Sequence, residues 1–172
     1  SGGHVEGVAL PRSLVYSNAG STYWKETRAV WSRWYTTPSP GDFDVRTASF
    51  RLASGIGPTF VVLHGPTSVA GAANVGPNDW RPDIAAMATT SDGPTDLQYC
   101  VVWETDGDVK GQRYDALGTI GGAIDVASGP DEEVAPSVGA GACEFTVAYG
   151  RRVGISFAET LAARVLADGT VA

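Results

Sequence analysis

An internal repeat constrains the fold of this chain more than any other feature of its sequence. Residues 44–66 align without a gap with residues 108–130, and seven of the 23 aligned positions are identical. The pair Phe50 and Tyr114 also keeps an aromatic ring at one position. A short repeated unit buries an apolar face only by stacking on its neighbours. The sequence therefore predicts several copies of one unit that share a core.

A fainter third copy follows the first two. Residues 163–170 align with residues 112–119. Upstream, Trp31, Trp103 and Tyr149 occupy one position in the three copies, which predicts that all three are core residues. The matches predict a single domain, residues 1–172, with repeats at approximately 11–66, 82–130 and 136–172, the last completed by residues 1–8.

Each copy is predicted to contain four strands. The 22 glycines and 10 prolines agree with many short strands and tight turns. The dipeptide Asp106-Gly107 predicts a tight hairpin in the middle copy. Alternating apolar and polar residues mark the strands of that copy as Asp83–Ala88, Gln98–Glu104, Val109–Asp115 and Ala123–Ala127. The predicted fold class is all-β, with three four-stranded antiparallel repeats as β-propeller-like blades, or alternatively a β-prism or a β-sandwich.

The two ends of the sequence bear on how the repeats are completed. The third copy stops at Val171-Ala172, where a fourth strand is due, while residues 2–6 resemble residues 121–125 in the fourth strand of the middle copy. We therefore expect the N-terminal strand to complete the third copy. Because propellers have about four to eight blades, another copy of the chain or further repeats are expected as partners.

Charge and composition exclude several function classes. The formal net charge of −7 argues against nucleic acid as a partner, because nucleic-acid binding needs a basic face. No apolar run approaches the roughly 18 residues of a membrane-spanning helix, so we expect no membrane insertion. The N-terminus lacks a signal-peptide pattern, and Ser1 is expected to be a processed or cut end. Cys100 and Cys143 are predicted either to form a disulfide or to be free thiols.

The copies differ most in two insertions. Twelve residues separate Trp31 from Asp44, whereas four separate Trp103 from Asp108. The second insertion covers residues 67–80. Insertions in repeat proteins map to loops, often on the binding face. Aromatic side chains beside an arginine suit sugar rings and protein interfaces, which predicts a ligand-binding site formed by Arg33, Trp34, Tyr35 and Trp80. The alternative is that these residues fold back and cap a sheet.

Two short segments resemble parts of an α/β-hydrolase. Val61–Gly65 resembles its oxyanion strand, and Gly154–Ala158 is close to its nucleophile elbow. Residues 156–168 also have the capping-box and four-residue spacing of a helix, so strand and helix both remain open there. Against a hydrolase, no other segment has helical periodicity, and His4 precedes the serine whereas the base follows it in that fold.

A metal site is not expected from the sequence. Glu104, Asp106 and Asp108 lie close together, but they lack the longer ligand series of a calcium-binding EF-hand. An acidic hairpin turn explains these residues better. The sequence therefore predicts no metal, no cofactor and no enzymatic activity.

The strands of the middle copy also resemble a known kind of repeat. Residues 98–104 and 109–116 are similar to tandem β-repeats of large secreted or surface proteins of bacteria, in which Val-Val-Trp, Gln-Arg-Tyr-Asp-Ala and Pro-x-Val-Ala strands recur. The resemblance covers roughly residues 80–172. It implies a propeller-like, non-catalytic module, extracellular or on the bacterial cell surface. We expect a binding or assembly role with a glycan or protein ligand; a secreted hydrolase or its accessory domain, and a purely structural fragment of a long repeat protein, are the alternatives.

Overall fold

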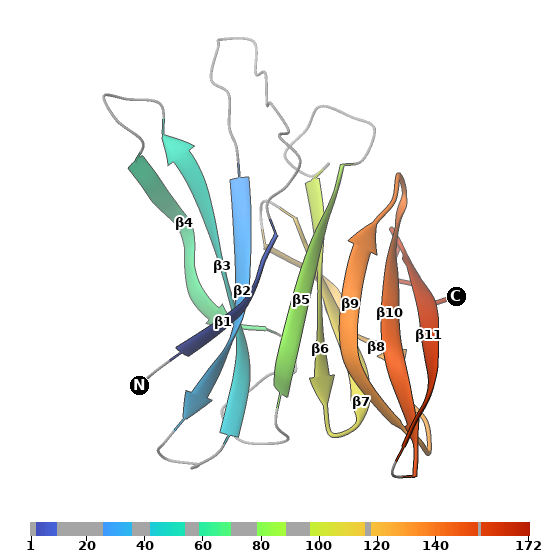
Figure 1. The fold of residues 1–172 in the computed structure, drawn as a ribbon. Coiled ribbons are helices and arrows are strands. Elements are labelled where there is room, and N and C mark those ends of the chain that lie inside the picture. The colour runs from blue at the N-terminus through green and yellow to red at the C-terminus, as the bar shows by residue number, and fades with distance from the viewer. Residues whose placement is uncertain are drawn as a thin grey trace.

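The described part of the chain folds into three antiparallel β-sheets (Figure 1). The computed structural model describes residues 3–9, 26–35, 42–53, 59–69, 79–88, 97–115, 118–154 and 156–172. The strands are β1 (Gly3–Ala9), β2 (Glu26–Tyr35), β3 (Asp42–Ala53), β4 (Thr59–Ser68), β5 (Asp79–Ala88), β6 (Leu97–Thr105), β7 (Asp108–Asp115), β8 (Gly118–Ala127), β9 (Glu132–Ala140), β10 (Glu144–Val153) and β11 (Ser156–Leu166). The predicted all-β class is confirmed.

Consecutive strands pair with one another in every sheet. The first sheet has the order β1-β2-β3-β4, the second β5-β6-β7-β8, and the third β11-β10-β9. The four strands predicted for the middle copy fall inside β5 to β8. The predicted Asp-Gly hairpin is also confirmed, since Asp106 and Gly107 have φ angles of 48° and 84° between β6 and β7. Positive φ at both central residues is what a type I′ turn requires.

The N-terminal strand is not where the sequence predicted it. β1 pairs with β2, with Ala9 opposite Arg28, and so belongs to the first sheet rather than the third. β1 is thus the first strand of its sheet, as β5 and β9 are of theirs. This pairing is favoured because strands close in sequence pair at the lowest loop-closure cost. The strand expected at residues 11–15 lies outside the described residues.

The third sheet contains the beginning of a fourth strand in the place where one was expected. After β11 the chain turns back, and Val171 forms a bridge with Val165. Arg164 and Ala172 exchange two backbone hydrogen bonds, each with the N–H of one residue donating to the carbonyl oxygen of the other over 2.9 Å. The segment 156–166 is a strand, so the helix considered from its spacing is wrong.

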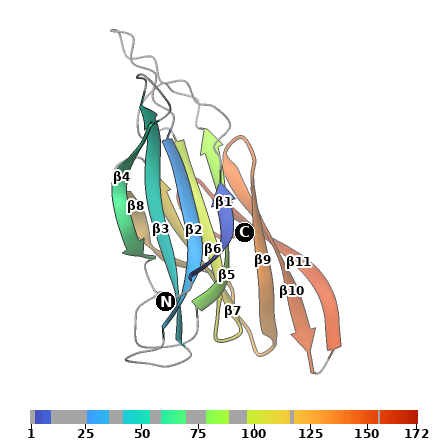
Figure 2. The same ribbon diagram turned by 60° about the vertical axis from the view of Figure 1, so that its left-hand side comes forward.

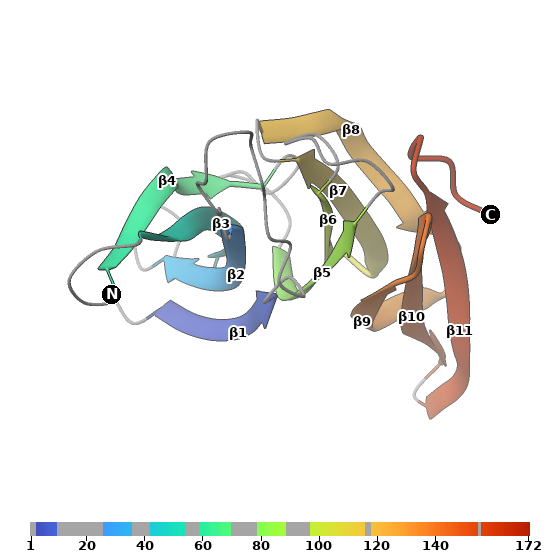
Figure 3. The same cartoon turned by 90° about the horizontal axis from the view of Figure 1, so that it is seen from above.

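The sheets stack face to face, with the third farthest from the first (Figures 1 and 2). β5 lies between β1 and β9 and contacts both, as the view from above shows (Figure 3). In the described part of the chain the three sheets do not close into a ring. One buried cluster fills the space between the first and second sheets: Val30, Val45, Val69, Ile84, Tyr99, Val101, Trp103 and Tyr114. Another lies between the second and third sheets: Met87, Cys100, Val102, Val109, Val126, Val138, Phe145, Val147, Tyr149, Ala163 and Val165.

Strand alternation explains how a single strand contributes to these cores. In β10, Phe145, Val147 and Tyr149 are buried, whereas Thr146 and Ala148 between them are exposed. Successive side chains of a strand point to opposite faces of the sheet. The third sheet therefore has one apolar face on the second sheet and one face of small residues directed outward. Trp103 and Tyr149 are core residues as predicted, and Trp31 is half-buried.

Candidate functional site

Three strand ends bring aromatic residues together at one end of the molecule. Strand register places Trp34, near the end of β2, opposite Phe43, near the start of β3. The Phe43 ring lies 6.2 Å from the ring of Trp80, at the start of β5, with a tilt of 41°. Trp80 is 38% exposed, one of two large hydrophobic side chains exposed in the described residues. The backbone thus brings the predicted residues Trp34 and Trp80 to one end of the stack.

Arg33 and Tyr35 flank Trp34 at the same strand end. Arg33 is opposite Asp44 and Tyr35 is opposite Asp42 in the pairing of β2 with β3. Arg33 is half-buried, and the side chains of Trp34 and Tyr35 lie outside the described part. The register therefore places the backbone of these residues at the same end of the stack as Trp80, and a shared binding site stays a prediction.

The Trp80 side chain is held in place by two charged residues. Its Nε1–H donates a hydrogen bond to Oε1 of Glu104 over 2.7 Å. The guanidinium of Arg81 lies 4.9 Å from the Trp80 ring centre, in cation–π geometry. Arg81 also donates to the second oxygen of Glu104 over 3.2 Å. An exposed ring held in this way loses little conformational entropy when a ligand contacts it.

Glu104 is buried and has a third donor on the neighbouring sheet. Only 3% of the residue is exposed, and its Oε2 accepts the backbone N–H of Ala135 in β9 over 3.0 Å. Arg81 and Ala135 both have positive φ, 47° and 51°, a conformation that costs a non-glycine residue about 1–2 kcal/mol. Hydrogen bonds to a charged acceptor offset this strain. Glu104 therefore joins the Trp80 site to the contact between the second and third sheets.

Sequence reasoning did not find the roles of Glu104 and Arg81. In the sequence, Glu104 suggests only a calcium ligand, and the short acidic series argues against that role. Its three donors come from residues more than twenty positions away, and no local pattern reports such a contact. Phe43 lies within the first insertion, but its sequence context does not distinguish it as a site residue. Among the described residues, no group of three or more His, Cys, Asp or Glu side chains could hold a metal ion.

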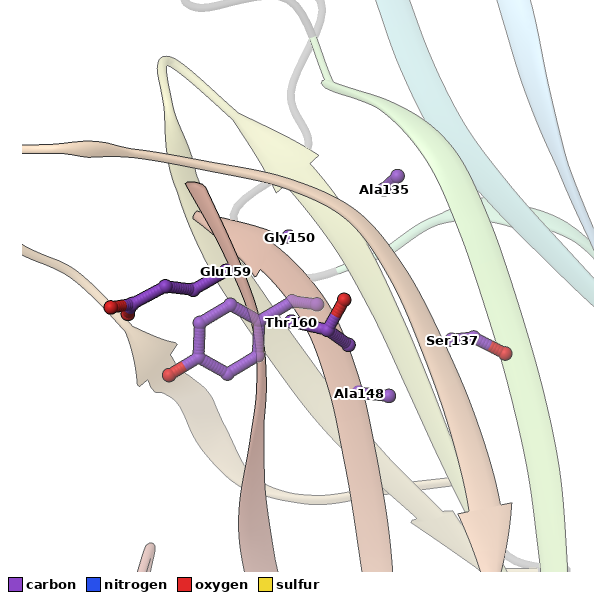
Figure 4. A pocket seen from close by; sticks show the side chains of 7 residues that line it. Ala135, Ser137, Ala148, Gly150, Glu159 and Thr160 are labelled. Atoms are coloured by element: carbon purple, nitrogen blue, oxygen red, sulfur yellow. The ribbon is translucent and has the colours of Figure 1, made fainter. Parts of the chain in front are cut away.

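A hollow lies on the third sheet (Figure 4). It has a volume of about 500 Å³ and opens widely to solvent. Its lining comes from all three strands of the sheet: Ala135, Ser137, Ala148, Tyr149, Gly150, Glu159 and Thr160. Most of these side chains are small, and Tyr149 and Glu159 are the two larger ones.

The two cysteines do not form a disulfide. Cys100 is buried in the core between the second and third sheets, whereas Cys143 is exposed in the turn between β9 and β10. Burial, partly opposed by the charge of Arg113, raises the pKa of the Cys100 thiol to about 12. A thiol with so high a pKa is not a nucleophile at neutral pH.

The residues considered for a hydrolase lie on different sheets. His64 is in β4 of the first sheet, and Ser156 begins β11 of the third. Their side chains lie outside the described part. The described residues of the Trp80 site are Phe43, Trp80, Arg81 and Glu104. They place one exposed aromatic ring and one cation on a buried carboxylate.

Comparisons with known proteins add no further assignment. Within the described residues, no helix has the length and apolar character to cross a membrane. Searches against protein-family models, curated proteins and solved structures find no match to this chain.

Proposed function

We propose that this chain is a non-catalytic binding and assembly module of propeller-like blades that works outside a bacterial cell. The bacterial, extracellular setting rests on the resemblance of its repeats to those of secreted and surface proteins. Support for blade-like stacking comes from three antiparallel sheets packed face to face with β1, β5 and β9 on one side. The sheets supply the scaffold, and the strand ends supply the contact surface.

The observation that carries the binding role is the exposed, anchored ring of Trp80. Tryptophan and arginine are the residues most enriched among the energetically dominant contacts of protein interfaces. Here they lie together, with the Phe43 ring 6.2 Å from that of Trp80 and with Glu104 accepting from both donors. An isolated exposed aromatic residue needs no explanation, but one fixed by a buried carboxylate indicates a preorganised surface.

A protein ligand fits this surface better than a glycan. A sugar ring stacks on an open aromatic face, and the guanidinium of Arg81 already covers one face of Trp80. A protein partner uses the ring, the cation and the neighbouring Phe43 together. Glycan binding is the alternative, and the same experiment distinguishes the two.

The test is binding of a displayed peptide library and of a glycan array to the whole chain, with two matched variants. We expect selected peptides to bind the protein, and Trp80→Ala to weaken that binding at least tenfold, which is about 1.4 kcal/mol. Val153→Ala removes the other large hydrophobic side chain that is exposed, at 50%, and is expected to leave binding unchanged.

Three results would count against the proposed role. Binding that Trp80→Ala and Val153→Ala reduce equally would show that the surface is not specific. Binding to glycans but not to peptides would replace the protein ligand with a sugar. Hydrolysis of an ester or glycan substrate that is lost in Ser156→Ala would replace a binding role with catalysis.

A further inference from the structure

The two ends of the stack expose sheet faces that have no neighbouring sheet in the described part of the chain. On the third sheet, Thr146 and Ala148 of β10 are exposed on the outward face. On the first sheet, Val30 of β2 is buried against the second sheet. Strand alternation therefore directs Ala29 and Trp31, its neighbours, to the other face. Both are half-buried.

The aromatic residue of the repeat points in the same direction at both internal interfaces. Trp103 packs toward the first sheet, and Tyr149, at the same repeat position, packs toward the second. Each of these sheets thus directs this aromatic position toward the sheet that precedes it. Trp31 holds the position in the first sheet, on the face where a preceding sheet would lie.

At each interface an arginine reaches the other way, from one sheet to the sheet that follows it. Arg28 of the first sheet lies 5.2 Å from the ring centre of Tyr99 and 4.7 Å from that of Tyr114 on the second sheet. It also donates to the carbonyl oxygen of Asp115, at the end of β7, over 3.3 Å. Such contacts combine cation–π attraction with a charge-assisted hydrogen bond.

Arg113 of the second sheet makes the corresponding contact with the third. Its guanidinium donates to the carbonyl oxygens of Ala167 and Asp168, in the turn after β11, the latter over 2.9 Å. Arg28 and Arg113 thus make equivalent contacts at two successive interfaces. Each reaches the chain reversal that follows the third strand of the next sheet.

The third sheet has the corresponding arginine but no next sheet. Arg164 aligns with Arg113 in the repeat, yet its side chain is 58% exposed and pairs with Glu144 of its own sheet. Beside it, Ala148 aligns with the buried Val102 and lines the hollow of Figure 4. The outward face of the third sheet therefore has an arginine like the one that crosses from the second sheet to the third. It also has open space at the position where Val102 packs between those two sheets.

We propose that the outward face of the third sheet binds the first sheet of a second copy of this chain, head to tail. The face around Ala29 and Trp31 of the second copy would lie over the hollow, as the Tyr149 face lies over the second sheet. Because the two surfaces differ, the contact is heterologous and generates a ring or an open filament. This contact deepens the assembly half of the proposed function, whereas ligand binding at Trp80 is independent of it.

The experiment measures the mass of the full chain by sedimentation, using three Ala→Glu variants. Ala148→Glu places a charge on the third-sheet face, and Ala29→Glu places one on the first-sheet face. Ala142→Glu is the matched control, in the exposed turn between β9 and β10. We expect the wild type and Ala142→Glu to associate at about 100 μM, where a contact with a Kd of about 0.1 mM is visible. Ala148→Glu and Ala29→Glu are each expected to be monomeric.

Mixing the two monomeric variants is the decisive step. Each retains the face that the other has lost, so an equimolar mixture is expected to form a dimer through one intact contact. Near-UV circular dichroism of each variant checks that it is folded, and an unfolded Ala29→Glu is replaced by Ala29→Lys. A wild type that stays monomeric at the same concentration would overturn the contact. Association that only Ala148→Glu abolishes would replace it with a symmetric contact between two third sheets.

Discussion

Replacing Glu104 tests whether one buried carboxylate joins the second sheet to the third. Glu104→Ala removes the acceptor for Trp80 Nε1, for Arg81 and for the N–H of Ala135. Hydrogen bonds to a charged group contribute about 1.5–3 kcal/mol each. The Arg81 side chain is 46% exposed, so that pair counts for about 0–1 kcal/mol. Water also partly replaces the acceptor at Trp80, which is 38% exposed.

The expected loss is therefore about 2–4 kcal/mol in the free energy of unfolding. For a chain of this length it corresponds to roughly 5–15 °C in Tm, at about 2–4 °C per kcal/mol. Urea unfolding followed by tryptophan fluorescence measures it directly. Glu104→Gln is expected to cost a similar amount, because its amide group turns a donor toward at least one of the three donors.

A surface glutamate provides the matched control. Glu132 pairs with Arg152 over 3.0 Å, and its side chain is 45% exposed. Exposed ion pairs of this kind contribute about 0–1 kcal/mol, so Glu132→Ala should change stability little. If Glu104→Ala and Glu132→Ala differed by less than about 1 kcal/mol, the role assigned to Glu104 would be refuted.

Three further predictions concern a turn, the thiols and a buried carboxyl group. Gly107→Ala should lower the unfolding free energy by about 1–2 kcal/mol, because Gly107 has a φ of 84°; Gly122→Ala, with open space around it, should leave urea unfolding almost unchanged. In the native protein a thiol reagent should modify Cys143 rapidly and Cys100 only after denaturation, because burial raises the pKa of the Cys100 thiol to about 12. Burial, partly opposed by the charge of Arg151, raises the pKa of the Glu133 carboxyl group above its ordinary 4.5. The folded state therefore binds the carboxyl proton more tightly than the unfolded state does. The free energy of unfolding should fall as pH rises above about 4.5. Glu133→Gln should remove that fall in urea unfolding measured across pH, and an unchanged pH profile would contradict the assignment.

The strands of the middle copy could be predicted because their signals are local. Alternation and bounding turns mark β6 and β7 to within one residue of their ends, and the Asp106-Gly107 turn needs only two residues. β5 and β8 begin four and five residues before the predicted strands. The helix considered for residues 156–168 shows where such signals fail. Phe157, Leu161 and Val165 recur every four residues, and a spacing of four also returns to the same face of a strand. Pairing with β10 then decides in favour of the strand.

Sheet membership and the Trp80 site depended on information that no short segment holds. The likeness of residues 2–6 to residues 121–125 led to the wrong partner for β1, because a glycine-rich pentapeptide specifies register weakly. An aromatic residue within an insertion is enough to predict Trp80 as a site residue. Its anchor Glu104 is 24 positions away, so only the folded chain shows why the ring is fixed.

The order of strands within each sheet has a consequence for how the chain folds. In the described part of the chain every pair of named strands joins neighbours in sequence. Each sheet therefore forms by closing the loops between consecutive strands, which costs less entropy than pairing strands far apart in the sequence. The long-range contacts are those between sheets, and they set the slow step in a fold of this kind. We therefore expect destabilising mutations in the buried clusters between sheets, rather than in the hairpins, to slow folding. The stability of such an array is approximately the sum of the stabilities of the single sheets and of the interfaces between neighbouring sheets.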